Sequence, residues 1–174
     1  MKKHPLAAML TAALLACLPL SAAALTPQDE QALQTALQDF AAHAQAGRGD
    51  AVIDASMPPA LLAHLADRMG GVTTAQVKQL LQRQIDVLMQ QTQVESFRYD
   101  MAAAQEKVSA NGRPYLLIPY ETVFEMRQTR QTGKSHILAL KENGTWYLLR
   151  LDQAAQLKLI QETYPDLADL TLPE

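Results

Sequence analysis

The sequence is poor in the residues that form reactive or metal-binding sites. Cys17 is its only cysteine. His43, His64 and His136 are not spaced like zinc ligands, and no His-Glu-x-x-His pattern occurs. A Gly-x-Ser-x-Gly turn, a phosphate-binding loop and a dinucleotide fingerprint are absent as well. We therefore expect neither a bound metal nor a cofactor.

Neither sign of charge is in large excess. The 174 residues carry a formal net charge of −3, and 19% of them are charged while 48% are hydrophobic. This composition excludes a disordered chain and indicates one domain with an adequate core.

The N-terminus has the pattern of a signal peptide. Lys2 and Lys3 form its basic start, residues 6–20 its apolar segment, and three alanines precede a cleavage site after Ala24. The apolar segment is too short for a stable membrane span. Cleavage would leave residues 25–174 as a single periplasmic domain without cysteine. That domain keeps 13 of the 15 basic residues against 18 acidic ones, a net charge of −5, which disfavours nucleic acid and anionic membranes as partners.

A second interpretation of the same segment stays open. The residues that end at Cys17, Leu-Leu-Ala-Cys, resemble the lipobox of bacterial lipoproteins. In that case Cys17 would be lipidated and would anchor the protein to a membrane.

The chain after the leader is expected to begin with helices. Thr26 is a good N-cap with Pro27 at the first helical position, and Leu33, Leu37 and Phe40 recur at helical spacing. A second helical region is expected from residue 50 to residue 71, with a break at Pro58-Pro59. A third helix is expected to begin at Thr73 with a capping box, and a last one over residues 153–163.

Residues 94–151 predict an antiparallel sheet of four strands. The expected strands run over residues 95–105, 113–127, 134–141 and 145–151. Asn111-Gly112 and Asn143-Gly144 are the residue pairs that two-residue type I′ turns favour, and residues 130–134 predict a looser turn.

Alternation on the second strand indicates which face is buried. The face with Leu116, Ile118, Tyr120 and Phe124 is the more apolar, so we assign it to the core. Pro119 lacks an N–H group and predicts a bulge, a bend or an edge at its position.

This order of elements resembles the nuclear-transport-factor-like superfamily, a cystatin-like α+β cone. The resemblance rests on Asp50-Ala51-Val52-Ile53-Asp54, on Phe97-Arg98-Tyr99 and on the closing segment Asn143-Gly144-Thr145-Trp146-Tyr147-Leu148-Leu149. It implies N-terminal helices packed on a curved antiparallel sheet, with a short C-terminal helix outside the usual core. A cystatin-like sheet remains the competing fold. Members include isomerases, dehydratases, binding proteins and accessory modules, so the fold does not settle the function.

Two sets of residues are candidates for a site. Tyr120, Phe124 and Trp146 would form an aromatic wall for an apolar ligand if they do not simply fill the core. His136 would converge with Asp100 and Tyr120 as an acid/base group if it faces the interior, and the sequence leaves the phase of its strand open.

We expect a non-catalytic exported protein that binds a small apolar ligand or an envelope partner. One alternative is an enzyme of the isomerase or hydrolyase type that uses His136 and Asp100. A second alternative is an interaction module that forms a homodimer through its exposed sheet face.

Overall fold

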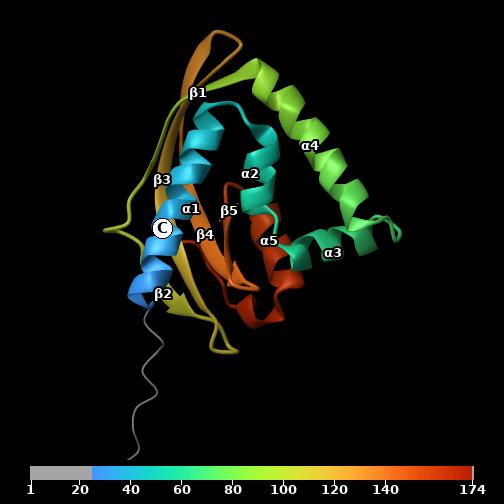
Figure 1. Ribbon diagram of the computed structural model, residues 1–174, viewed down its shortest axis with the longest axis vertical. Helices are drawn as coiled ribbons and strands as arrows, with labels where there is room; N and C mark the ends of the chain where they lie inside the picture. Colours follow the sequence, from blue (N-terminus) through green and yellow to red (C-terminus); the bar gives the residue numbers. More distant parts are fainter. Residues whose placement is uncertain (1–24, 174) are drawn as a thin grey trace, which may run out of the picture.

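The computed structural model describes residues 25–173 and has the predicted α+β architecture. The expected leader with Cys17 lies outside these residues. Helices come first, then the sheet, then a short helix and a 3₁₀ turn (Figure 1). The elements are α1 (Pro27–Gln45), α2 (Gly49–Ser56), α3 (Pro59–Arg68), α4 (Thr74–Gln91), β1 (Thr92–Tyr99), β2 (Gln105–Val108), β3 (Pro114–Met126), β4 (Thr129–Glu142), β5 (Thr145–Arg150), α5 (Ala154–Thr163) and η1 (Pro165–Leu167).

The helix boundaries follow the capping signals of the sequence. The Thr26 hydroxyl accepts a hydrogen bond from the Asp29 amide, and Pro27 opens α1. Thr73 and Gln76 form the predicted capping box at the start of α4. Pro59 occupies the first position of α3, where its missing N–H group costs no intrahelical hydrogen bond.

The sheet is antiparallel and curled, with strand order β1-β3-β4-β5, and β2 also pairs with β3. The expected first strand is corrected to two strands, β1 and β2, because residues 100–104 leave the sheet. Pro119 lies opposite this interruption, and its carbonyl accepts from the Asp100 amide. The N–H and C=O groups of a strand residue point the same way, so the missing N–H of Pro119 faces the gap.

One of the predicted turns has the expected conformation. Asn143 and Gly144 both have positive φ, as a type I′ turn requires. At residues 109–113 only Gly112 has positive φ, and its N–H bonds the Ser109 carbonyl, so a longer loop replaces the predicted two-residue turn.

The predicted turn over residues 130–134 is wrong. Arg127 and Gln128 adopt positive φ instead, and Gly133 lies inside β4 opposite Thr122. Neither position carries the Gly or Asn that usually signals positive φ, and side chains with β carbons rarely adopt this conformation.

The sheet is buried on both faces over its lower half. The predicted core face packs against α1 and α2, around Leu33, Leu37, Phe40, Ile118 and Leu148. The opposite face is covered by α5, η1 and the C-terminal tail, with a second core formed by Leu117, Leu138, Leu149, Ile160, Leu167 and Leu170. The final helix and tail are therefore part of the body of the protein.

Between residues 25 and 173, no helix is both long enough and apolar enough to cross a membrane.

Helix α2 approaches α4 closely at Gly49. A β carbon on this residue would lie 2.7 Å from Ile85 Cγ2 and 3.0 Å from Asp86 Oδ1. We expect Gly49→Ala to lower the free energy of unfolding by about 1–3 kcal/mol, because the branched Ile85 side chain has little room to move. Urea unfolding measures this change.

Gly133→Ala is the matched control. Its β carbon would meet Thr122 Cγ2 at 3.5 Å, an ordinary contact, and alanine costs less backbone entropy than glycine in a strand. Its urea midpoint should equal or exceed that of the wild type. If Gly49→Ala unfolds at the same urea concentration as this control, close packing of α2 on α4 is not a constraint.

Candidate functional site

An apolar cavity of ≈ 300 Å³ lies between the concave face of the sheet and the helices. The sheet supplies Val94, Phe97, Phe124 and Met126 to its wall. Helices α1 and α2 add Phe40, Ala44 and Val52, and α4 adds Ile85, Leu88 and Met89. The size and the lining fit the range typical of small-molecule sites.

A β-bulge brings two of these side chains to the same face. Val94 pairs with Phe124, but Ser96 pairs with Val123, so Glu95 is the extra residue in β1. Without a bulge, residues three positions apart point to opposite faces of a strand. The bulge therefore lets both Val94 and Phe97 reach the cavity.

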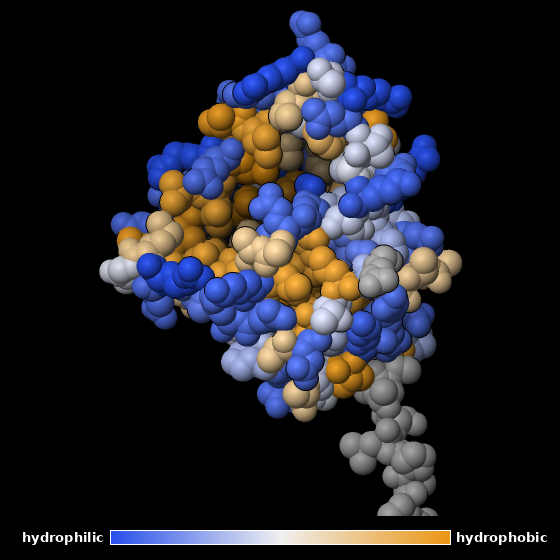
Figure 2. Space-filling view, turned by 180° about the vertical axis from the view of Figure 1, so that it is seen from behind, coloured by the Kyte–Doolittle hydropathy of each residue, from blue (hydrophilic) through white to orange (hydrophobic). Residues whose placement is uncertain are grey.

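Helix α4 leaves its apolar side partly uncovered. It packs mainly on α2 and α3, and Leu88 remains 48% exposed although it lines the cavity. Figure 1 shows α4 standing apart from α1 and the lower sheet. Seen from behind, the molecule has a hollow with hydrophobic walls and hydrophilic atoms beside it (Figure 2).

Three polar side chains line the cavity. Thr122 is buried and donates to the Ser96 carbonyl at 3.2 Å. The Thr92 hydroxyl is buried and has no hydrogen-bond partner within residues 25–173. Arg150 is the only charged lining residue among those described. A buried hydroxyl without a partner is uncommon in proteins and could bond a bound molecule or water.

Arg150 belongs to a compact polar cluster at the end of β5. Its Nε donates to the Tyr120 hydroxyl at 2.9 Å, and its Nη2 lies 2.7 Å from Asp152 Oδ2. The Tyr120 hydroxyl in turn donates to Asp152 Oδ1. Burial raises the pKa of Tyr120; the nearby Arg150 charge opposes this, and the bond to Asp152 adds to it. The phenol therefore stays neutral over the physiological pH range.

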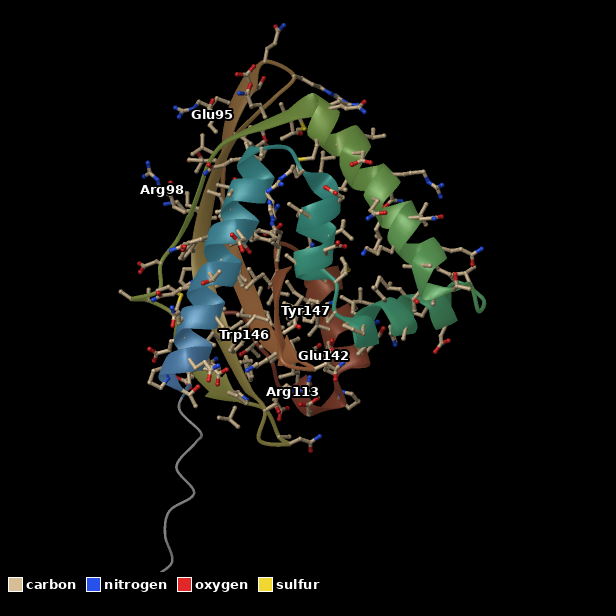
Figure 3. All side chains as sticks on the ribbon, in the orientation of Figure 1. Glu95, Arg98, Arg113, Glu142, Trp146 and Tyr147 are labelled. Atoms are coloured by element: carbon tan, nitrogen blue, oxygen red, sulfur yellow. The ribbon has the colours of Figure 1, made fainter. Side chains whose placement is uncertain are left out.

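The three predicted ligand-wall residues have different positions. Phe124 lines the cavity. Tyr120 stacks on Phe97 with ring centroids 5.0 Å apart and contacts Arg150 at the edge of the site. Trp146 is buried in the core beneath α1 and is not among the residues that line the cavity (Figure 3).

The three predicted acid/base residues line a different, more open cleft of ≈ 580 Å³. The register pairs His136 with Pro119 and Tyr120 with Ser135, which places His136 and Tyr120 on opposite faces of the sheet. His136 is therefore on the face away from α1, which settles the phase that the sequence left open. The Asp100 carboxylate accepts from the amides of Ala102 and Ala103, as in a turn cap.

The cleft lacks the contacts of a general acid/base pair. Within the described chain, no hydrogen bond or ion pair joins Asp100 to His136. The neighbouring charges form surface pairs such as Lys134–Glu121, at 3.1 Å. Figure 3 shows Glu95 and Arg98 pointing outward from the sheet on this side. A catalytic base is normally oriented by a hydrogen-bonded partner, and the His136 ring has none among residues 25–173.

No cluster of three or more metal-binding side chains occurs in residues 25–173. His43 instead contacts Arg48, and His64 Nε2 lies 3.7 Å from Glu162 Oε2.

Comparison of the chain with protein-family models, curated proteins and solved structures found no match. The function must therefore be argued from the geometry.

The Tyr120 hydroxyl holds Arg150 and Asp152 together. We expect Tyr120→Phe to lower the free energy of unfolding by about 1–2 kcal/mol, because it leaves two partly buried partners without this bond. Thermal or urea unfolding gives the value. Tyr99→Phe is the control, since the Tyr99 hydroxyl makes no hydrogen bond to a described residue. Equal losses for both variants would show that the cluster contributes nothing specific.

Burial lowers the pKa of His136 below its usual value near 6.5. As pH falls through 6.5, the unfolded chain binds a proton before the folded one does, so the free energy of unfolding falls. We expect wild type to lose more stability than His136→Gln on going from about pH 8 to about pH 5. NMR titration of the imidazole checks the pKa directly, and a value at or above 6.5 would contradict the assignment.

Proposed function

We propose that this protein is a non-catalytic binding protein that holds a small apolar ligand in the cavity beneath α4. The observation that carries the proposal is the cavity itself, which is bounded by α1, α2, α4 and the sheet and has a mostly apolar wall. An apolar guest would displace water from this wall and would cover Leu88, so binding would be favoured by the hydrophobic effect.

The architecture supports membership in the nuclear-transport-factor-like superfamily as part of this proposal. Helices precede a curled antiparallel sheet, and the cavity lies on its concave side. Export to the periplasm, with cleavage after Ala24 or anchoring at Cys17, belongs to the proposal as well. It is supported by the basic and apolar pattern of residues 1–24.

The alternatives have less support from the geometry. The isomerase or hydrolyase hypothesis needs His136 and Asp100 to act together, and no contact joins them within the described residues. A dimer through the sheet would bury the outer face of its upper half, which carries the ion pairs Arg130–Glu95 and Lys134–Glu121. Burying such pairs costs desolvation.

Filling the cavity should weaken binding without unfolding the protein. Val94→Trp places an indole in the cavity, and we expect it to weaken binding of the uncharged dye N-phenyl-1-naphthylamine by at least about tenfold. The increase in dye fluorescence on titration measures the affinity.

Val108→Trp is the matched control. Val108 is 36% exposed on β2 and is not among the lining residues, so this variant should bind the dye like the wild type. Equal binding by Val94→Trp and wild type would place the dye elsewhere. A wild type that does not bind the dye at all would count against the proposed function.

A further inference from the structure

The charge on the cavity wall is already neutralised. Arg150 is the only charged residue among the described lining residues, and Asp152 Oδ2 lies 2.7 Å from its Nη2. The guanidinium also lies over the Tyr120 ring, 5.3 Å from its centroid. Arg150 and Asp152 together carry no net charge, although Arg150 presents a cation to the cavity.

Asp152 is held in place by more than its ion pair. Its Oδ1 accepts from the Tyr120 hydroxyl, which itself accepts from Arg150 Nε. Tyr120 is fixed by stacking on Phe97, with an interplanar angle of 14°, and Phe97 lines the cavity. A ligand that displaced Asp152 from Arg150 would therefore also disturb the bond that Asp152 accepts from the Tyr120 hydroxyl.

A carboxylate ligand would meet unfavourable charge at this position. Two negative groups, the ligand carboxylate and Asp152, would then share the single positive charge of Arg150. The apolar wall beside them weakens the screening of this repulsion by water. An uncharged acceptor, such as an ester carbonyl or an alcohol, avoids this repulsion. The guanidinium has five N–H donors; its Nε donates to Tyr120, and its Nη2 is paired with Asp152.

The cavity also suits an elongated guest. Thr122, Phe124 and Met126 are successive inward-facing residues of β3 that line it, and together they span about 13 Å of strand. Arg150 lies on β5, whose pairing with β4 stops at Ile137, whereas Thr92 pairs with Met126 at the far end of β3. The polar groups therefore lie toward the two ends of an apolar channel.

We infer that the ligand is an uncharged amphiphile with a medium-length apolar chain, and that Asp152 is the specificity residue that excludes free carboxylic acids. This inference rests on the proposed ligand-binding function. Arg150 would donate to the acceptor group of the ligand while the chain lies along Phe124 and Met126.

The test compares methyl decanoate with decanoate, which have the same chain and differ in charge at neutral pH. Each competes with N-phenyl-1-naphthylamine on the full mature chain, and calorimetry measures each affinity directly. We expect the ester to bind at least about tenfold more tightly than the carboxylate at low salt. The ratio should shrink at high salt, because Arg150 and Asp152 are partly exposed.

Asp152→Asn should remove the discrimination. It leaves Arg150 as an uncompensated cation, so we expect the ester-to-carboxylate affinity ratio to fall by about tenfold or more. Asp169→Asn is the control for total charge, since Asp169 is exposed and does not line the cavity. Arg150→Gln should weaken the ester by about fivefold through the lost donor.

Each outcome supports or overturns the inference. Equal affinity for ester and carboxylate in the wild type, or tighter carboxylate binding, would overturn it while dye binding still supports the cavity. An unchanged ratio in Asp152→Asn, with its urea midpoint close to wild type, would overturn the role of Asp152. Failure of dye, ester and carboxylate alike to bind the wild type would overturn the proposed function and this inference with it.

Discussion

The concave face of a curled sheet must be covered by side chains from other elements, and this constraint shapes the whole molecule. In the lower half of the sheet, α1 and α2 cover the concave face and the C-terminal segment covers the opposite face. Residues such as Leu117, Ile118 and Leu148 are therefore fully buried. In the upper half α4 faces the sheet across a gap. Close contact with Gly49 sets the position of α4, and the gap remains as the apolar cavity.

The end of strand β5 separates the apolar part of the site from its polar part. Strand β5 is shorter than β4 and pairs with it only as far as Ile137, so the edge of β4 beyond that point has no further neighbour in the sheet. Arg150 ends this strand and meets Tyr120 and Asp152. The Arg150 guanidinium thus lies beside the apolar wall, and Asp152 pairs with it.

Much of the fold could be predicted because its signals are local. The capping box at Thr73, the Asn143-Gly144 turn and the stripe containing Leu37 and Phe40 depend on nearby residues only. The turn at Arg127-Gln128 could not be predicted, since its conformation is imposed by pairing of β3 with β4. For the site, Phe124 was predicted, but Arg150 was missed because its position depends on long-range contact with Tyr120. The bulge at Glu95 likewise has no local signal.

If the cavity beneath α4 is the ligand site, the methyl groups on its wall should respond to a ligand in NMR spectra. Titration of the labelled protein with decanol would report on Leu88, Met89 and Val94 in the cavity and on Leu172 in the open cleft of the other face. Binding in the cavity should give saturable shifts for the cavity methyl groups and none for Leu172. Unchanged cavity resonances at saturating decanol, or shifts confined to Leu172, would contradict it.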